Sequence, residues 1–346
     1  MTMVAVALVP LLGLLYIGGY KFERDWREIV QTQLMLTAND IDGRVNAWAD
    51  TNLRALRENA ALADMVSMDP ARQTPVLKAI RGAYEWAYLV FSVNRDGQNI
   101  GRSDDNPPAN YQYGDRDYFR QVIEGKPVGQ EVVIGKTSQK PALILAGPIR
   151  DAGGALEGVL ALAMEVAEIS RIVASAKIGE TGFAILIDEN KKVIAHGRPQ
   201  QITRSLQDLS AHPALSAAGA AQAPAVYDDA GERVIGHTRK TALGWTLIIQ
   251  QNHDDAFAPL LEARRNALIL MAFALALVLG VAYLLSRQLA RPISELTAVA
   301  DQLSRGNFDM KIVGTERRDE IGALARAVER MAVSIRMAFE RLRKKT

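Results

Sequence analysis

Ten residues at 110–119, NYQYGDRDYF, combine three tyrosines, a phenylalanine, two aspartates and one arginine. An arginine offers a planar fork of N–H donors to a carboxylate, and tyrosines can surround such a group with hydroxyls and ring faces. Arg116 could therefore bind an acidic ligand inside a wall made by Tyr111, Tyr118 and Phe119. The alternative is a solvated loop, in which Arg116 pairs with a neighbouring aspartate and the aromatic rings belong to the core.

Little else in the chain suggests catalysis or metal binding. Cysteine is absent, which excludes disulfides, thiolate metal sites and a cysteine nucleophile. The stretch IGKTSQ at 134–139 contains part of a phosphate-loop motif, but Gln130 stands where that motif requires glycine. The histidines lack the spacing of a metal motif: His196, His212, His237 and His253. We therefore expect no enzymatic activity, no metal and no cofactor.

Two uncharged stretches stand out in a chain of 346 residues whose net charge is only +2. Residues 3–20 would form about 27 Å of helix, enough to cross a bilayer. Residues 267–286 are equally apolar and are bracketed by arginines. The first stretch could instead be a cleaved signal peptide, but it lacks a basic n-region and an A-x-A-like cleavage site. We predict transmembrane helices at 1–21 and 264–286 and no nucleic-acid partner.

Two transmembrane helices would place both termini on one side of the membrane and residues 21–264 on the other. Apolar residues at helical spacing predict one long helix over 22–60. Beyond Tyr84, short β-rich runs alternate with turns, and residues 88–101 resemble residues 182–197 in their strand–turn–strand pattern. The expected fold is α+β, with a long N-terminal helix that carries two antiparallel-sheet modules.

Two amphipathic helices are predicted after the second span. Pro292 suits a first helical turn, and a glycine-containing connector occupies 306–318. The apolar stripe of the first helix is Ile293, Leu296, Ala300 and Leu303, and that of the second is Ile321, Leu324, Val328, Met331, Ile335, Ala338 and Leu342. Alternating steps of three and four predict a coiled-coil seam. One pair of helices is too small to bury both stripes, so a parallel four-helix bundle in a homodimer is favoured over a monomeric hairpin.

These features resemble two known families. RPISELTAVADQLSRGNFD and RRDEIGALARAVERM, directly after the span, resemble a HAMP domain over 287 to about 341. The region 22–260 resembles a double Cache (dCache) sensor domain, in which two PAS-like modules hang from one helix, through NRDGQNIGRS, DRDYF, ALEGVLALAMEV and GFAILIDENKKVIAHG. The resemblance implies a bacterial inner-membrane receptor with its sensor in the periplasm and HAMP in the cytoplasm.

The implied domains follow the chain in order. They are a first transmembrane helix at 1–21, a long helix with the membrane-distal Cache module at 22–175, a membrane-proximal module at 176–263, a second transmembrane helix at 264–286, and HAMP with the start of an output helix at 287–346. The HAMP resemblance also implies a role in signal relay for Pro292 and Glu320.

The dCache resemblance gives the stretch at 110–119 a specific meaning. In dCache receptors for amino acids, a tyrosine, an arginine after four intervening residues and then an aromatic pair bind the ligand in the distal module. Tyr111, Arg116, Tyr118 and Phe119 have this spacing, although Tyr118 replaces a tryptophan and Phe119 a tyrosine. Further residues are secondary candidates for the wall of the pocket: Trp86, Tyr88, Ser103 and Lys140.

The rest of the amino-acid pattern is missing. A further tyrosine of the family is absent, with Ile134 nearby, and Ala163 stands where an aspartate would hold the ligand's ammonium group. Glu165 lies two residues further along the same strand face and could substitute. We therefore expect a ligand with a carboxylate or similar anionic group rather than an α-amino acid.

The predicted function is that of a homodimeric transmembrane receptor without enzymatic activity. It would bind a small ligand outside the membrane and pass the signal through HAMP to a cytoplasmic output of the kinase, methyl-accepting or cyclase type. The alternative is a membrane-anchored scaffold, or a sensor of a periplasmic protein partner, with no small-molecule ligand. This alternative predicts an unfilled or collapsed distal pocket.

Overall fold

The structure, a computed structural model, describes residues 2–198, 207–217, 223–307 and 310–343. Within the first 20 residues, surroundings beyond the backbone are described for Gly13, Tyr16 and Gly19 alone. The description of side chains ends at residue 338. The chain divides into two compact units. One unit is residues 24–259, and the other combines residues 1–23 with 260–346.

A single long helix runs along the first unit, as the sequence predicts. Helix α1 (Thr2–Ala60) buries a stripe at steps of three and four residues, formed by Val30, Leu34, Ala38, Ile41, Val45 and Ala49. This spacing keeps one face of a helix turned toward the same neighbour. Two shorter helices follow, α2 (Ala63–Val66) and α3 (Pro70–Ala83). The side chain of Asp69 caps α3 by accepting a hydrogen bond from the backbone N–H of Ala71 at 2.9 Å.

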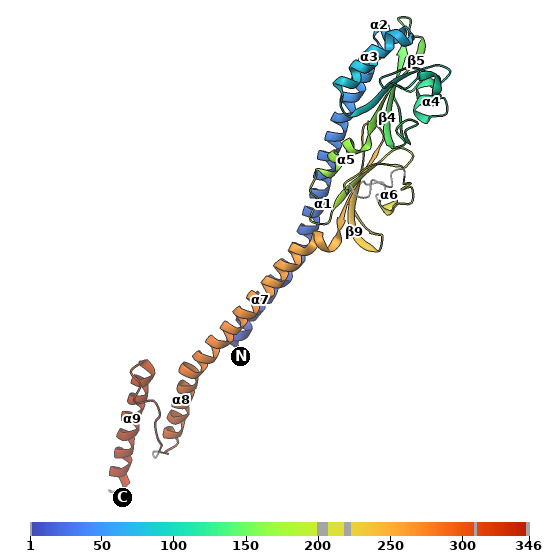
Figure 1. Cartoon of the computed structure of the whole chain (residues 1–346). Helices are drawn as coiled ribbons and strands as arrows, with labels where there is room; N and C mark the ends of the chain where they lie inside the picture. Colours follow the sequence, from blue (N-terminus) through green and yellow to red (C-terminus); the bar gives the residue numbers. More distant parts are fainter. Residues whose placement is uncertain (1, 199–206, 218–222, 308–309, 344–346) are drawn as a thin grey trace. The chain divides into compact units, whose positions relative to one another are not determined.

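The first antiparallel sheet, called the distal sheet here, has the order β2–β1–β5–β4–β3. Its strands are β1 (Ala87–Asn94), β2 (Asn99–Arg102), β3 (Gly129–Ile134), β4 (Pro141–Arg150) and β5 (Leu156–Glu165). The short helices η1 (Pro108–Asn110) and α4 (Asp117–Ile123) lie between β2 and β3. Helix α3 packs on β1 and β2, whereas α4 packs on β3, β4 and β5. The two helices lie on opposite sides of the sheet (Figure 1).

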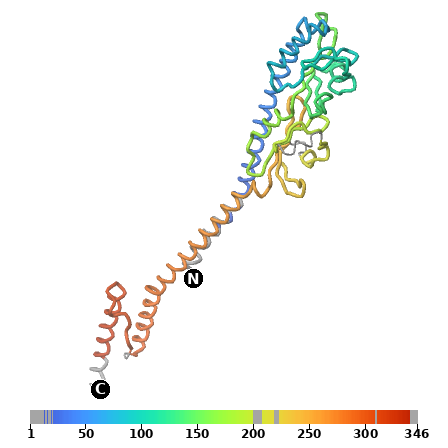
Figure 2. The backbone as a smooth tube through the Cα atoms, viewed as in Figure 1, coloured from blue at the N-terminus to red at the C-terminus, as the bar shows by residue number. Residues whose placement is uncertain are grey.

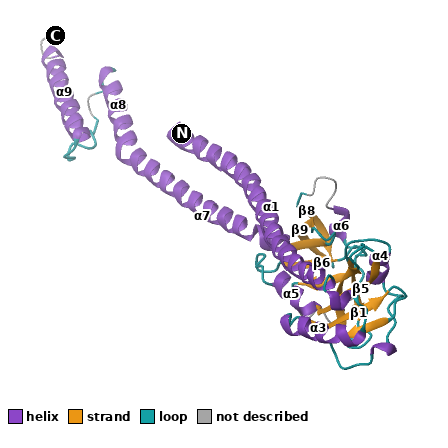
Figure 3. Cartoon of the chain, turned by 90° about the horizontal axis from the view of Figure 1, so that it is seen from above, coloured by secondary structure: helices purple, strands orange, loops and turns teal. Residues whose placement is uncertain are grey.

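The second antiparallel sheet, the proximal sheet, repeats this plan. After α5 (Val166–Ala174) come β6 (Phe183–Ile187), β7 (Val193–His196), α6 (Pro213–Ala217), β8 (Ala225–Asp229), β9 (Glu232–Lys240) and β10 (Thr246–Asn252). The strand order β7–β6–β10–β9–β8 corresponds strand by strand to that of the distal sheet. The predicted pair of similar antiparallel sheets behind one long helix is therefore confirmed (Figure 3).

One helix among the described residues is long and apolar enough to cross a membrane, within His253–Ser304. Its first part is α7 (His253–Leu285), where large apolar side chains such as Leu270 and Phe273 are exposed. An exposed apolar helix of this length fits a lipid environment. The other predicted span, residues 3–20, is helical, but most of its side chains lie outside the described residues. That span remains a prediction.

The HAMP-like segment folds into two packed helices. A π-helical turn, η3 (Ser286–Ala290), leads into α8 (Arg291–Ser304), and α9 (Glu320–Arg343) follows the connector. Pro292 lies in the first turn of α8 and Glu320 begins α9, as expected. The residues buried between the two helices are Leu296, Val299, Leu303, Ile321, Ala325, Val328 and Ala332.

This seam differs in part from the predicted one. Ala325 and Ala332 are buried against α8, whereas Leu324 and Met331 are about half exposed. Ile293 on α8 is also exposed. On α9 the buried face is therefore rotated from the predicted stripe, with Ala325 and Ala332 in the places expected for Leu324 and Met331, and within one chain these two large residues and Ile293 remain outside. The dimeric four-helix bundle that could cover them remains a prediction.

Gly322 permits the tight junction between the connector and α9. A Cβ at this position would overlap the carbonyl oxygen of Arg317, while Asp319 caps the helix by accepting from the N–H of Gly322 at 3.0 Å. We expect Gly322→Ala to open this junction and speed amide exchange at 319–325 about tenfold, the loss of roughly one hydrogen-bonded cap. Exchange mass spectrometry on the full chain in nanodiscs would measure it. Gly280→Ala, with nothing within 4 Å of the new methyl group, should leave these amides unchanged.

Candidate functional site

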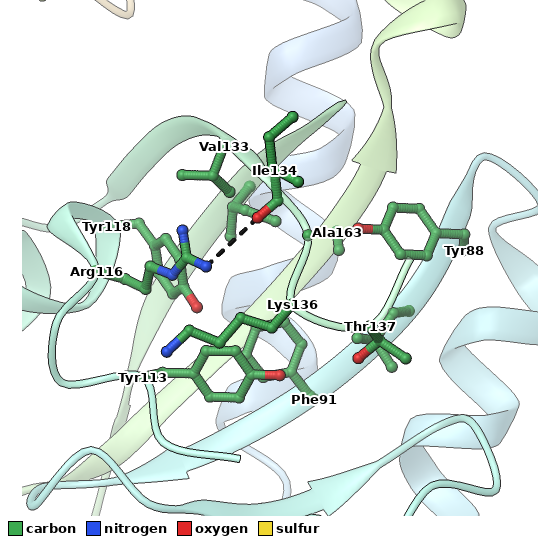
Figure 4. A pocket seen from close by; sticks show the side chains of 13 residues that line it. Tyr88, Phe91, Tyr113, Arg116, Tyr118, Val133, Ile134, Lys136, Thr137 and Ala163 are labelled. Atoms are coloured by element: carbon green, nitrogen blue, oxygen red, sulfur yellow. Dashed lines mark hydrogen bonds between the residues drawn. The ribbon is translucent and has the colours of Figure 1, made fainter. Parts of the chain in front are cut away.

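A hollow lies on the face of the distal sheet that α4 covers. Its lining residues are Tyr88, Leu89, Phe91, Tyr113, Arg116, Tyr118, Val133, Ile134, Gly135, Lys136, Thr137, Ile144 and Ala163 (Figure 4). Ala163 on β5 lies between Leu89 on β1 and Ile144 on β4, so the floor is apolar. The hollow measures about 320 Å³ and is open to solvent, but its side chains leave an interior cavity of only about 20 Å³. That is room for about one water molecule.

Arg116 precedes α4 and reaches into this hollow from its rim. Its Nη2 donates to the carbonyl oxygen of Ile134 over a long 3.4 Å, drawn as the dashed line in Figure 4. Among the described residues its carboxylate neighbour is Asp115, whose Oδ2 lies 3.9 Å from Nε. Nε is buried and has no hydrogen-bond partner among the described residues. Buried donors in folded proteins are nearly always satisfied, so this guanidinium retains capacity to bind an anion.

Lys136 supplies a second positive charge to the same wall. Its Nζ donates to Asp115 Oδ1 at 2.8 Å and to the backbone oxygen of Gln112, and it lies 5.4 Å from the centre of the Tyr113 ring. The described lining residues include no aspartate or glutamate. The wall is therefore cationic, and Asp115 at its edge is the carboxylate that contacts both cations.

A buried arginine holds part of the wall in place. Arg102, only 1% exposed, forms a two-pronged ion pair with Asp104 at 2.7 and 2.8 Å. It also donates to the hydroxyl oxygens of Tyr113 at 2.8 Å and Thr137 at 2.9 Å. Its guanidinium carbon lies 4.2 Å from the centre of the Tyr111 ring. One side chain thus fixes two lining residues from different segments.

The groups of this network keep the same protonation states around neutral pH. Burial alone would raise the pKa of Asp104, but hydrogen bonds from Arg102 and Asn106 bring that pKa below its ordinary value. Burial raises the pKa of Tyr113 in spite of its arginine neighbour. Asp104 is therefore ionised and Tyr113 protonated at neutral pH, which leaves the tyrosine oxygen free to accept from Arg102.

The predicted site residues divide into two groups. Arg116, Tyr118 and Tyr88 line the hollow. The others do not: Tyr111 stacks on Arg102, Phe119 belongs to the core, Trp86 donates to Asn52 on α1, the Ser103 hydroxyl accepts from the N–H of Val90, and Lys140 is exposed. Which of these residues contact a ligand remains a proposal.

Lys136, Thr137 and Tyr113 escaped the sequence-based prediction. The first two lie in IGKTSQ, whose sequence suggests only an incomplete phosphate loop, and Tyr113 lies within NYQYGDRDYF. Ala163, predicted to replace an acidic residue, does face the hollow, whereas Glu165 is not among its lining residues. The glycine, lysine and threonine at 135–137, directly after the buried strand β3, were the available signal for a functional loop.

His196 and His237 lie in strands, His212 precedes α6 and His253 begins α7, and no group of three potential metal ligands lies together among the described residues. His196 is buried in the proximal sheet, where its ring stacks on Phe183 at 5.0 Å between centroids. Its Nδ1 accepts from the N–H of Arg198 at 3.0 Å. Burial, together with the charge of Arg198, lowers its pKa from 6.5 to about 4.

This shift predicts acid sensitivity of the sensor. The unfolded chain takes up a proton at His196 near pH 6.5 and the folded chain only near pH 4, so stability is complete above pH 6.5 and falls between these values. The loss should amount to about 3 kcal/mol. Thermal unfolding from pH 7.5 to 4 should show a smaller loss in His196→Gln than in the parent. A parallel decline in both proteins would contradict the prediction, and His253→Gln serves as the control.

Family models match two parts of the chain. Residues 22–260 match the dCache_1 model, described as a Cache domain, and residues 284–337 match the HAMP domain model. Both matches agree with the resemblance seen in the sequence, and they leave only the N-terminal segment, residues 261–283 and the C-terminal end outside.

Relatives with known roles include chemotaxis receptors. The chain is 24% identical over 253 residues to the methyl-accepting chemotaxis protein TlpA of Bacillus subtilis, an alignment that covers 71% of this chain and 36% of the relative. It is 25% identical over 257 residues to PctB of Pseudomonas aeruginosa, covering 70% and 39%. The chain thus spans well under half the length of these relatives.

Solved structures share the fold of the sensor. The ligand-binding domain of PctB from Pseudomonas aeruginosa, in complex with L-Arg, aligns with a TM-score of 0.54 at 18% identity, over 67% of this chain and 98% of that one. The ligand-binding domain of CtaA from Pseudomonas fluorescens, in complex with L-isoleucine, aligns with a TM-score of 0.54 at 14% identity, over 69% and 97%.

Proposed function

Because this chain belongs to the Cache domain family and carries a HAMP domain after it, we propose that it is a transmembrane receptor for a small carboxylate-bearing ligand. The observation that carries the proposal is the Nε of Arg116, which is buried at the wall of the distal hollow and has no hydrogen-bond partner in the described part of the chain. The signal would pass through α7 and HAMP to a cytoplasmic output. The receptor itself would have no enzymatic activity.

The charges of the wall favour a ligand without an α-amino group. The described lining residues include two cations and no acid. A buried ammonium group without a carboxylate partner is strongly disfavoured, and Ala163 on the floor offers none. A ligand carboxylate could bind Arg116 and take the place of Asp115 at Lys136. The known neighbours in complex with L-Arg and L-isoleucine support a small organic acid in this hollow, although the ligand proposed here lacks the amine.

The topology follows from the same proposal. A sensor of this family lies outside the inner membrane, so we place residues 24–259 in the periplasm and the HAMP segment in the cytoplasm. The exposed apolar residues of α8 and α9 support a homodimer at HAMP. The similarity to methyl-accepting chemotaxis proteins favours a chemotaxis output over a kinase or a cyclase.

The small cavity favours a second candidate function. Only about 20 Å³ is free inside the hollow, far below the 300–1,000 Å³ of ordinary ligand pockets. A sensor of a periplasmic protein partner needs no pocket at all. The ligand proposal instead requires the loop of Lys136 to move outward, and its ion pair with the exposed Asp115 can be exchanged at small cost.

Thermal unfolding of the full chain in nanodiscs tests the two candidates. The panel holds carboxylates, amino acids, amines and purines. A ligand at one hundred times its dissociation constant should add about 2.7 kcal/mol, and Arg116→Ala should abolish that gain. Arg120→Ala, an exposed arginine paired with Asp117, should retain it. No shift with any compound, and Arg116→Ala as stable as the parent, would favour the protein-partner candidate.

A further inference from the structure

Gln130 joins the wall of the distal hollow to the proximal sheet, and we infer that it is the positioning residue through which a change at that wall reaches the start of α7. The inference gives the proposed receptor an internal route for its signal. It rests on the proposed function for its purpose, but its test needs no ligand. Failure of ligand binding and failure of this route can therefore be distinguished.

The first step of the route connects α4 to β3. The carboxylate of Glu131 on β3 accepts from the N–H groups of Asp117 and Tyr118 at 2.8 and 3.3 Å, at the end of α4 beside Arg116. A Cβ at Gly129 would overlap the carbonyl oxygen of Tyr118, so helix and strand are in direct backbone contact. Displacement of Tyr118 in the wall must therefore displace β3.

The second step fixes Gln130 itself. Gln121 on α4 accepts from the N–H of Gln130 at 3.0 Å and donates to its carbonyl oxygen at 3.2 Å. This pair of bonds satisfies the outer edge of β3 and ties its backbone to the helix. The Nε2 of Gln130 in turn donates to the carbonyl oxygen of Leu243, outside the distal sheet, at 2.8 Å.

Leu243 lies in the turn between β9 and β10, and hydrogen bonds hold this turn in place. The N–H of Thr241 donates to the carbonyl oxygen of Trp245 at 2.9 Å, and Trp245 is completely buried. Asn46 on α1 accepts from the N–H of Ala242 at 3.1 Å. The turn is thus clamped between the long helix and Gln130, so a shift of Gln130 acts on a small rigid element.

The last step of the route runs along the backbone from β10 into α7. Strand β10 ends at Asn252 and helix α7 begins at His253, so the strand continues into the helix without a loop (Figure 2). The backbone oxygen of Ala256 in this first turn accepts from the indole N–H of Trp26 at 3.1 Å. Movement along β10 is therefore delivered to α7 against α1, the two helices of the sensor that lead to the membrane.

A second contact between the two sheet modules offers a matched control. Lys126 Nζ and Glu189 Oε2 are 3.9 Å apart, and both side chains are about half exposed. Ion pairs of this kind contribute little. The hydrogen bond of Gln130 is shorter, at 2.8 Å, and partly buried, so it is the stronger link, and the effects of Gln130→Ala and Lys126→Ala should differ accordingly.

The test is hydrogen exchange on the full chain in nanodiscs, with Ala163→Leu as a substitute for an occupant of the hollow. Ala163 is buried on the floor, so the larger side chain must push on α4 and β3. We expect exchange to change in α4 and, by about three- to tenfold, in residues 241–257, the range that loss of one hydrogen bond produces. Gln130→Ala should cancel the second change and leave the first, whereas Lys126→Ala should cancel neither.

Two results would overturn the inference. Residues 241–257 could respond equally in the Gln130→Ala background, which would assign the coupling to α1 or β5. They could also stay unchanged while α4 responds, which would mean that no coupling exists. If Ala163→Leu fails to fold, Ala163→Val and Tyr118→Leu alter the same wall by smaller amounts and are subject to the same criteria.

Discussion

Arg102→Met is expected to lower the free energy of unfolding of the sensor by about 3–5 kcal/mol, the usual effect of breaking a buried ion pair. The substitution leaves Asp104 without its two-pronged partner and removes the donors to Tyr113 and Thr137. Methionine retains the packing of the aliphatic part of the arginine side chain, so the loss should come mainly from the missing guanidinium group. Chemical denaturation of the full chain, followed through the proximal and distal sheets by hydrogen exchange, measures the loss.

The comparison with two other variants isolates the cause. Arg102→Lys keeps the charge but cannot form the fork, so its loss should fall between those of the parent and the methionine variant. Arg95→Met changes an exposed arginine in the turn after β1 and should alter stability by less than about 0.5 kcal/mol. A loss below about 1 kcal/mol in Arg102→Met would mean that the network behaves like a surface pair and does not hold the wall.

Helices and strands could be predicted from the sequence wherever a single periodic pattern determined which residues are buried. The apolar positions of α1 recur every three or four residues along the sheets, and the two strand–turn–strand passages fold into sheets of the same order. At HAMP the pattern was ambiguous, because steps of three and four allow either Leu324 or Ala325 in the seam. In the structure Ala325 occupies the seam between the two helices. Which of the two residues does so depends on how the helices pack against each other, and the sequence of one helix does not specify that packing.

The wall of the hollow was predictable only in part. Arg116, Tyr118 and Tyr111 all belong to the spacing pattern of the family, but only the first two line the hollow. Tyr111 stacks on Arg102 instead. Lys136 reaches the wall because the turn after β3 folds back, with the N–H of Gly135 bonded to the carbonyl oxygen of Lys140 at 2.9 Å. This turn places Lys136 at the hollow and leaves Lys140 exposed. The residue types alone do not distinguish the two lysines.

Ala163→Asp is expected to reverse the ligand preference by at least about 100-fold, toward compounds that carry an ammonium group beside the carboxylate. The new carboxylate would lie on a buried floor below Arg116 and Lys136. A ligand that is only an anion would then meet a like charge, which disfavours binding by several kcal/mol. A ligand ammonium would supply the partner that a buried carboxylate requires.

Matched pairs of compounds make this reversal measurable, since 2-hydroxy and 2-amino acids differ at one group alone. Thermal shifts of the full chain should favour the hydroxy acid in the parent and the amino acid in Ala163→Asp. Ala163→Asn has the same shape without the charge and should gain no amino-acid binding. If parent and aspartate variant respond alike to every pair, position 163 does not face the ligand. If the parent already prefers the amino acid, another group must hold the ammonium, and the charge of the wall would not determine the ligand class.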